Sequence, residues 1–257
     1  MGKPLPYLDS ATPVAIAHRG FSSEGLENSL PAFRAAVRLG YGYVETDVHT
    51  TADGVALVFH DPTLDRVTDV HGSIAALTAA QVAAARINGR EPIPTLAELV
   101  TALPGVRINL DVKDDRSVAT VAAAIEKYRL HERVCVASFS DRRRRAVLRR
   151  LSRRTASSAG RGCTAAFVLL GPWLPHWLMR WLLRDVDCLQ VPLVYRSIRV
   201  LTPHSIVRAH RLGLKVHVWT IDDPALMHRL FDMGVDGVMT DRADVLAAVM
   251  RERGYWG

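Results

Sequence analysis

The 257-residue chain has few cysteines and no long hydrophobic run. Its three cysteines, Cys135, Cys163 and Cys188, have no CxxC spacing, which predicts reduced, buried thiols and a reducing compartment. No stretch reaches the roughly 18 uninterrupted apolar residues that a membrane-spanning helix needs. Residues 1–10 lack the apolar core of a secretory signal. We therefore expect a cytoplasmic protein, with peripheral contact at a membrane as an open alternative.

Acidic residues are outnumbered by basic ones, and the formal net charge is +7. Eight arginines lie between Arg142 and Arg154, with Ala146, Val147, Leu148 and Leu151 among them. This pattern predicts an amphipathic helix with one solvent-exposed basic face. A solvated surface is the favoured interpretation, and attraction to anionic lipid headgroups is the alternative. No nucleic-acid partner is expected, because no recognised binding motif accompanies the arginines.

Short apolar runs alternate with helical patterns along almost the whole chain. Strands are predicted at residues 14–17, 43–48, 106–112, 134–139, 163–168, 187–192, 215–220 and 237–240. Helices are predicted at residues 30–39, 96–103, 118–128, 143–151, 176–183, 204–212, 225–231 and 245–251. Eight such pairs predict the α/β class and a closed (β/α)8 TIM barrel.

The second predicted strand is followed by a break in this alternation. Residues 55–59 follow Asp53-Gly54, a strong turn signal, and are expected to pair back against that strand. Residues 61–94 lack a βα pattern and are predicted to form a short excursion over one end of the barrel. No linker is visible, so we interpret residues 1–257 as a single domain with its core at about residues 14–248.

Four chemically active side chains lie beside the first predicted strands. Glu45 and Asp47 are one residue apart and therefore point to the same face of a strand, where they could bind a hard divalent cation. His18 and His60 could supply an acid and a base. A pair of surface charges is the alternative for Glu45 and Asp47, but the apolar residues around them argue against an exposed strand. In a barrel, strand ends meet at one mouth.

An ordered set of motifs resembles the glycerophosphodiester phosphodiesterase family over roughly residues 14–248. The matching segments are His18-Arg19-Gly20, Glu27-Asn28-Ser29, Glu45-Thr46-Asp47-Val48, Thr51-Ala52-Asp53-Gly54, His60-Asp61, Leu64-Asp65-Arg66-Val67-Thr68 up to Gly72, Val218-Trp219-Thr220, Gly234-Val235-Asp236-Gly237 and Thr240-Asp241. The resemblance implies a phospholipase-C-like (β/α)8 barrel that cleaves a phosphodiester with the help of one divalent cation, Ca²⁺ or Mg²⁺.

The resemblance also implies roles for individual residues. His18 and His60 match the catalytic histidines, and Arg19 and Lys113 match positions that face the phosphate. The metal ligands correspond to three carboxylates, those of Glu45, Asp47 and Asp111. In the family a neighbouring glycerol hydroxyl is thought to attack, which gives a cyclic phosphate that water later opens.

Two positions depart from the family pattern. Asp111 stands where the family usually has glutamate, so the cation could shift, bind more weakly or recruit a water. Leu26 replaces a proline, but Asn28 or Ser29 can still cap the following helix, and we expect Asn28 to be a helix cap. We also expect Asp61 and Arg66 to form a structural ion pair.

Tryptophans raise two further questions. Trp219 lies at a strand end, either in the barrel core or as a flat wall for the substrate. Trp173, Trp177 and Trp181 repeat every four residues in an apolar segment, which favours a packed barrel helix. The alternative is an apolar wall at the mouth for an aliphatic chain or a bilayer interface, where tryptophan is enriched.

These patterns support three functional hypotheses. The leading one is metal-dependent hydrolysis of glycerophosphodiesters to sn-glycerol 3-phosphate and an alcohol. The second is a lysophospholipase D acting on lysophospholipids at a membrane surface. The third, from another class, is a non-catalytic module that binds anionic lipid or nucleic acid.

Overall fold

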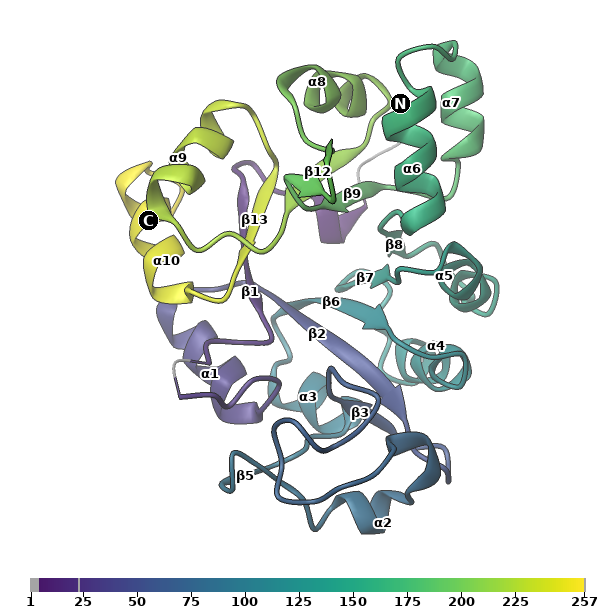
Figure 1. Cartoon of the computed structure of the whole chain (residues 1–257), viewed down its shortest axis with the longest axis vertical. Coiled ribbons are helices and arrows are strands. Elements are labelled where there is room, and N and C mark those ends of the chain that lie inside the picture. Colours follow the sequence, from purple (N-terminus) through teal and green to yellow (C-terminus); the bar gives the residue numbers. More distant parts are fainter. Residues whose placement is uncertain (1–4, 23, 257) are drawn as a thin grey trace.

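Eight parallel strands surround a common axis in the computed structural model, which describes residues 5–22 and 24–256 (Figure 1). They are β1 (Val14–His18), β2 (Tyr43–Thr50), β6 (Arg107–Val112), β7 (Val134–Ala137), β8 (Ala156–Ser157), β9 (Cys188–Val191), β12 (Lys215–Val218) and β13 (Gly237–Thr240). They are ordered β8-β7-β6-β2-β1-β13-β12-β9, and a parallel bridge between Ser158 and Cys188 joins the two ends. The predicted (β/α)8 barrel is confirmed. That one domain spans all of residues 1–257 stays a prediction.

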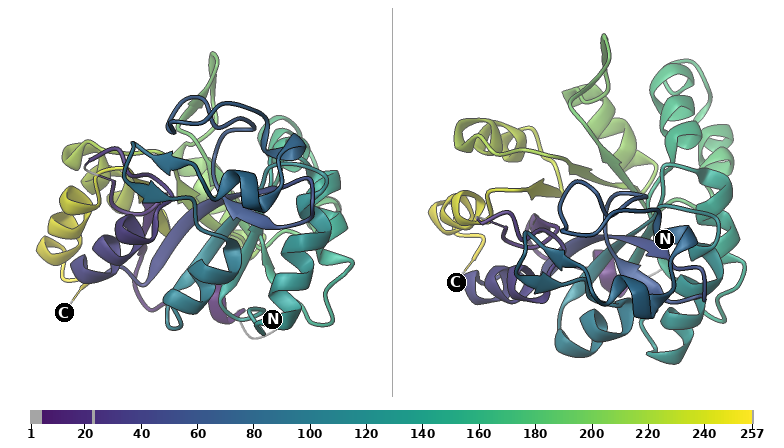
Figure 2. Two further views of the ribbon diagram at one scale, coloured as in Figure 1. Left: turned by 90° about the horizontal axis from the view of Figure 1, so that it is seen from below. Right: turned by 60° about the horizontal axis from the view of Figure 1, so that its bottom comes forward.

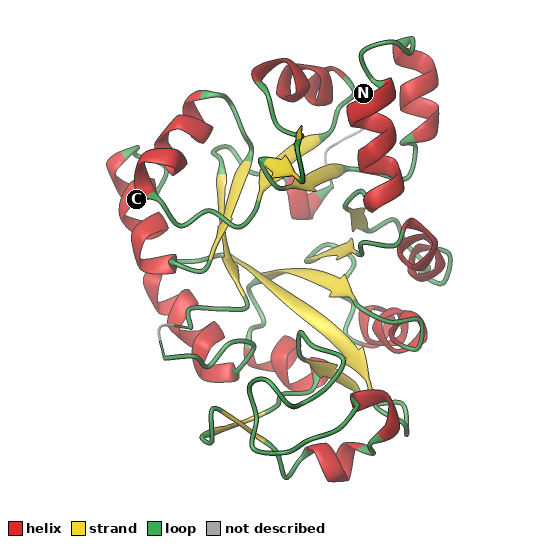
Figure 3. Cartoon of the chain, viewed as in Figure 1, coloured by secondary structure: helices red, strands yellow, loops and turns green. Residues whose placement is uncertain are grey.

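Helices follow most of these strands and cover the outside of the barrel (Figure 3). They are α1 (Leu30–Leu39), α3 (Leu96–Ala102), α4 (Ser117–Lys127), α5 (Asp141–Leu148), α6 (Arg161–Leu170), α7 (His176–Leu182), α8 (Pro203–Arg211), α9 (Pro224–Asp232) and α10 (Ala243–Glu252). In the described part of the chain, no helix is long and apolar enough to cross a bilayer.

The fifth predicted strand, at residues 163–168, is wrong. These residues lie in α6, and the fifth strand is the short β8, where small and hydroxyl residues give no apolar signal. Cys163 and Phe167 are buried four residues apart, the spacing of a helix that packs one face on the barrel. All three cysteines are buried free thiols, as expected.

The excursion after β2 is confirmed. β3 (Ala56–Val58) pairs antiparallel with β2, as predicted for residues 55–59. The chain then forms η2 (Ile74–Ala76), α2 (Ala79–Val82) and the two-stranded β4 (Arg86–Ile87) and β5 (Glu91–Pro92) around a small apolar core of its own. A second hairpin, β10 (Val194–Tyr195) and β11 (Ile198–Arg199), was not predicted and projects from the barrel (Figure 2).

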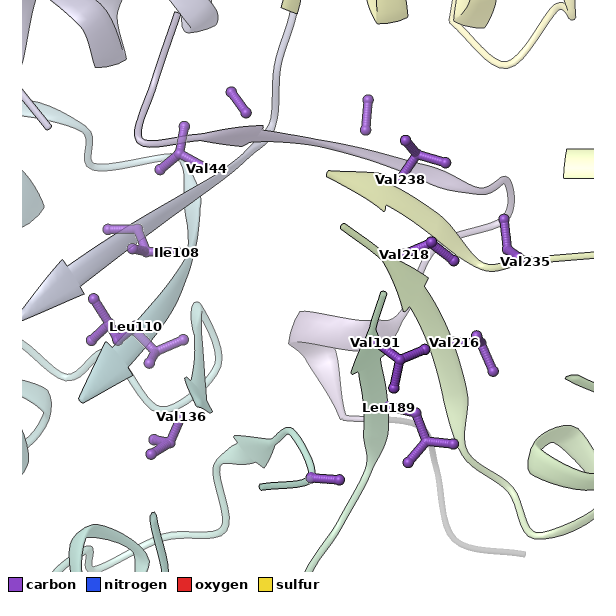
Figure 4. Packing of buried hydrophobic residues seen from close by; sticks show 14 of the residues in the cluster. Val44, Ile108, Leu110, Val136, Leu189, Val191, Val216, Val218, Val235 and Val238 are labelled. Atoms are coloured by element: carbon purple, nitrogen blue, oxygen red, sulfur yellow. The ribbon is translucent and has the colours of Figure 1, made fainter. Parts of the chain in front are cut away.

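Alternation along the strands separates two layers of side chains. Outward-facing valine, leucine and isoleucine residues of the strands belong to the main core cluster together with residues of the helices, and Figure 4 labels Val44, Ile108 and Val238 among them. The residues between them point into the barrel, where Ile16, Tyr43 and other side chains form a second cluster. Tyr7 of η1 (Pro6–Leu8) packs into this inner cluster. The side chains of β2 alternate in this way, so Glu45 and Asp47 share the inner face with Tyr43.

The first four arginines of the run lie in α5, but this helix does not present one solvent-exposed basic face. Arg144 is fully buried, and its guanidinium contacts Asp141 at 3.3 Å and Asp185 at 3.1 Å. Arg145 pairs with Asp185 at 2.6 Å, and Arg142 pairs with Asp115 at 2.5 Å. Several arginines of the run are therefore paired with carboxylates of the fold, which the charge pattern alone did not reveal.

A polar layer crosses the inside of the barrel. Gln190 donates to Asn109 at 3.0 Å and lies 3.5 Å from Nδ1 of His217. Burial lowers the pKa of His217 to about 4. Folded protein therefore binds fewer protons than the unfolded chain between about pH 4 and the ordinary histidine value of 6.5.

We predict that the free energy of unfolding falls as pH drops through this window and that His217→Gln removes up to about 3 kcal/mol of that fall. Urea unfolding at pH 7 and pH 4.5 measures the difference. His71→Gln is the matched control, because His71 is exposed and pairs only with Asp65. Equal pH dependence in the His217 variant and the wild type would contradict the assignment of a neutral, buried imidazole.

Candidate active site

Strand register places three carboxylates and a histidine side by side on the neighbouring strands β1, β2 and β6. His18 is aligned with Glu45 on the neighbouring strand, and Asp47 is aligned with Asp111. All three carboxylates are almost fully buried. His18 Nε2 lies 3.7 Å from Glu45 Oε2. The residues expected to bind a metal thus lie next to one another, at the mouth of the barrel.

Two cations are inserted among these carboxylates. Lys113 Nζ lies 2.8 Å from Asp47 Oδ1 and 2.6 Å from Asp111 Oδ2. Arg19 Nε lies 3.2 Å from Asp47 Oδ2, within ion-pair distance but not aligned as a hydrogen bond. Burial alone would raise the pKa of Asp47, but Lys113 and Arg19 hold it below its usual range. Burial opposes the charge of Lys113, yet Asp111 and Asp47 raise its pKa.

The negative charge of the three carboxylates exceeds the positive charge of Lys113 and Arg19. Burial and the charge of Asp47 raise the pKa of Glu45 well above its usual range, despite His18, Lys113 and Arg19 nearby. Asp111 Oδ1 is buried and has no hydrogen-bond partner. Three carboxylates therefore share two permanent cations, and one carboxylate oxygen is unsatisfied. Buried groups of this kind are costly unless a further cation or donor balances them.

His18 is oriented by an acidic partner that sequence reasoning did not assign. Its Nδ1 donates to Asp241 Oδ1 at 2.6 Å, so its Nε2 faces Glu45 and the carboxylate cluster. Burial would lower the pKa of His18, but Glu45 and the hydrogen bond with Asp241 raise it. Asp241 follows β13 directly. Its place at a strand end, within the quoted Thr240-Asp241 motif, was the available signal.

His60 is held in the same manner from the excursion side. Its Nδ1 donates to Asp61 Oδ1 at 2.6 Å, and Asp61 in turn pairs with Arg66, which confirms the expected ion pair. Arg66 Nη2 contacts Glu27 Oε1 at 2.6 Å, and Glu27 also contacts Arg19 Nη1 at 3.1 Å. This chain of ion pairs ties the excursion to the metal-ligand candidates, and each histidine is left with Nε2 for chemistry.

The loop between β1 and α1 explains the His-Arg-Gly motif. Gly20 has φ +84°, and a Cβ there would lie 2.7 Å from the backbone carbon of Ala32, so only glycine fits. Asn28 is not the helix cap. Its amide donates to Asp47 Oδ2 at 3.1 Å, and it accepts from Thr46 at 2.8 Å, while Ser29 caps α1. Asn28 therefore orients Asp47, a role the cap interpretation missed.

An aromatic wall stands beside the cluster. Trp219 is half-buried and packs edge-on against Phe139, with ring centroids 5.9 Å apart. Phe139 is 43% exposed, and Lys113 Nζ and the Arg161 guanidinium lie over its ring at 5.6 Å and 4.8 Å. Trp219 thus packs on the inner cluster of the barrel and also contacts Phe139. Whether its ring borders the substrate stays a prediction. Phe139 belongs to the same aromatic pair. The sequence predicted it as the last residue of a strand and gave no sign of this contact.

No three acidic, histidine or cysteine side chains converge on one point as a ready metal site within residues 5–22 and 24–256. The Lys113 ammonium instead lies between two of the expected ligands, Asp47 and Asp111. The site therefore consists of three neighbouring carboxylates, two histidine–carboxylate pairs and two cations.

Comparison with known proteins identifies the family. The family model described as "Glycerophosphoryl diester phosphodiesterase family" matches residues 18–245. A probable glycerophosphodiester phosphodiesterase 2 of Mycobacterium tuberculosis is 43% identical over 98% of this chain and 96% of the relative. A lysophospholipase D of Mus musculus is 25% identical over 88% of this chain and 82% of the relative.

A solved structure shares the fold. It is an Oleispira antarctica phosphodiesterase in complex with the product sn-glycerol-3-phosphate, with 23% identity and a TM-score of 0.77 over 93% of this chain and 97% of that chain. The family match spans nearly the whole barrel. The chain accordingly belongs to the glycerophosphoryl diester phosphodiesterase family.

Proposed function

We propose that the chain hydrolyses glycerophosphodiesters to sn-glycerol 3-phosphate and an alcohol with the help of a divalent cation and two histidines. Glu45, Asp47 and Asp111 would bind Ca²⁺ or Mg²⁺, and His18 and His60 would move the protons. The product in the complex from Oleispira antarctica supports the choice of glycerol phosphate as the part of the substrate that is retained. Membership of an enzyme family sets aside the non-catalytic binding module.

The candidate ligands fit a hard divalent cation in chemistry and in charge. All three supply carboxylate oxygens, the donors that Ca²⁺ and Mg²⁺ prefer. The raised pKa of Glu45 and the unpartnered Asp111 Oδ1 mark unbalanced negative charge at this place. When bound, such a cation would supply positive charge next to a phosphate oxygen. Asn28 donates to Asp47, so this ligand keeps one orientation.

Arg19 and Lys113 would bind the phosphate in this proposal. Both side chains are mostly buried against Asp47, which fixes their positions before a substrate arrives. Charge that develops on phosphate oxygens during attack would therefore meet oriented donors rather than mobile water. The Phe139–Trp219 wall lies beside Lys113 and would border the alcohol part of the substrate.

Proton movement is assigned to the two histidines. Each has Nδ1 bonded to a carboxylate, Asp241 for His18 and Asp61 for His60, so Nε2 is the nitrogen available to the substrate. One imidazole takes the proton of the attacking hydroxyl, and the other gives a proton to the leaving oxygen. The single observation that carries the proposal is the alignment of His18 with Glu45 and of Asp47 with Asp111 across three neighbouring strands.

We predict that EDTA abolishes hydrolysis of glycerophosphocholine and that added Ca²⁺ or Mg²⁺ restores it. Glu45→Gln removes one of the three carboxylates and should weaken cation binding by at least about tenfold, as measured by titration calorimetry. Asp115→Asn is the control, because this exposed carboxylate pairs with arginines of α5 and lies outside the cluster. Full activity in chelator would remove the cation from the proposal.

We predict that His18→Ala and His60→Ala each lower kcat by roughly 10²-fold or more, because proton transfer by a positioned side chain contributes about that factor. His71→Ala is the matched control, since its ring is exposed and pairs only with Asp65. Steady-state kinetics measure the loss, and circular dichroism verifies the fold. Retention of full kcat by both variants would show that the site is misplaced.

A second candidate substrate is a lysophospholipid. The exposed Phe139 ring at the mouth and the apolar residues Val194, Tyr195 and Ile198 of the projecting β10–β11 hairpin favour it, because they could contact an acyl chain. The lysophospholipase D relative supports the same chemistry on such a substrate.

We predict that Phe139→Ala lowers kcat/KM for lysophosphatidylcholine at least about fivefold more than for glycerophosphocholine, because only the former has a chain to bury. Val207→Ala, which trims an exposed apolar residue of α8, is the control. Equal effects on both substrates, or no turnover of the lysophospholipid by the wild type, would leave the soluble diester as the substrate.

A further inference from the structure

We propose that the α6–α7 helical hairpin docks the enzyme onto an anionic lipid surface. This inference goes beyond hydrolysis of glycerophosphodiesters and does not depend on it. Figure 1 shows α6 and α7 side by side at the edge of the molecule, with the turn that connects them pointing away from the barrel. The tryptophan repeat was predicted to pack against the barrel, and this prediction is wrong. Trp173, Trp177 and Trp181 are all exposed.

The exposed face of the hairpin is unusually apolar. Trp173 in the turn is 85% exposed, and Trp177 and Trp181 on α7 are 70% and 57% exposed. Leu169 and Leu170 continue this surface at the end of α6. Trp177 and Trp181 are four residues apart and therefore share one helix face. A contiguous set of large exposed apolar side chains marks a surface that binds something.

The fold does not need this face, because the opposite side of the hairpin already anchors it. Phe167, Met179 and Leu183 are buried in the main apolar core. The Arg208 guanidinium lies 4.7 Å from the ring centroid of Phe167, and His176 Nε2 donates to the Arg211 carbonyl at 3.0 Å. The hairpin is therefore packed firmly on the barrel and α8 while its tryptophans remain available.

The charges around the face favour an anionic bilayer as its partner. Residues 161–184 contain no aspartate or glutamate, whereas Arg161, Arg180 and Arg184 are present. The Arg184 guanidinium lies over the Trp181 ring, 5.1 Å from its centroid, so a basic group borders the apolar face directly. Tryptophan prefers the boundary between headgroups and acyl chains, and nearby arginines gain from anionic lipids.

The same helix connects this face to the active-site mouth. α6 begins at Arg161, whose guanidinium lies over Phe139 of the aromatic wall, and it ends at Leu170 beside the tryptophan turn. A ten-residue helix is about 15 Å long. Docking through the turn would therefore hold the mouth close to the lipid surface, where substrates derived from phospholipids arise.

Binding to vesicles tests the inference without any substrate. Wild-type protein should cosediment with vesicles of phosphatidylcholine containing 30% phosphatidylglycerol and only weakly with pure phosphatidylcholine. Three of the five tryptophans lie on the hairpin, so intrinsic fluorescence should shift to the blue on binding. The variant Trp173→Ser/Trp177→Ser/Trp181→Ser should lose at least about 100-fold in partitioning, since each indole buries a large apolar area.

Two further variants separate the contributions. Arg180→Gln/Arg184→Gln should lower partitioning to anionic vesicles by roughly 30-fold while hardly changing binding to neutral ones. Val207→Ser removes an exposed apolar residue of α8 and should change nothing. Circular dichroism and an unchanged thermal unfolding midpoint of the triple tryptophan variant verify that the barrel is folded, so a loss of binding cannot be attributed to a loss of structure.

The possible outcomes separate this inference from its rivals. Loss of vesicle binding in the triple tryptophan variant, with the fold retained by circular dichroism, supports the docking face. Absence of wild-type binding to anionic vesicles overturns it. If the wild type instead sediments as a dimer that the tryptophan variant dissociates, and vesicles bind neither, then a second copy of the chain covers the face and the lipid assignment is wrong.

Discussion

The burial of Glu45 and Asp47 on the inner face of β2 is the constraint on which the rest of the site depends. Alternation along the strand forces both carboxylates inward, where water cannot solvate them well. The fold meets this cost with Lys113, Arg19 and Asn28, each of which contacts Asp47. Glu45 and Asp111 remain incompletely balanced, and this excess of negative charge is the physical ground on which we propose a cation there.

Ion pairs of the site also connect elements that are distant in sequence. Glu27 contacts both Arg19 and Arg66, and Arg66 pairs with Asp61, the partner of His60. Asp241 from the end of the barrel orients His18 from its first strand. Positions of both histidines are thus set by carboxylates outside the proposed ligand set. Loss of an orienting carboxylate would leave a histidine in place but free to turn.

Much of the barrel could be predicted from the sequence, because seven of its eight strands are apolar and begin or end at clear turn signals. β8 could not, since Ala156 and Ser157 have no strand-like pattern, whereas the apolar residues of α6 have one. Glu45, Asp47 and the two histidines were visible as motifs. The contacts of Asp241 with His18 and of Phe139 with Trp219 were not, although Thr240-Asp241 stood among the motifs, because those contacts depend on which strand ends meet, and spacing along the chain does not encode that. The burial of Arg144 and the exposure of Trp177 were misjudged because composition does not reveal which face of a helix packs.

The account depends most on the claim that three carboxylates bind one divalent cation beside the histidines. Crystals soaked in Mn²⁺ would test it directly, because anomalous scattering locates that ion without any assumption about catalysis. The account predicts one peak within coordination distance of Glu45, Asp47 and Asp111, with the Nε2 atoms of His18 and His60 facing it. A map with strong Mn²⁺ peaks elsewhere on the protein and none at these carboxylates would contradict it.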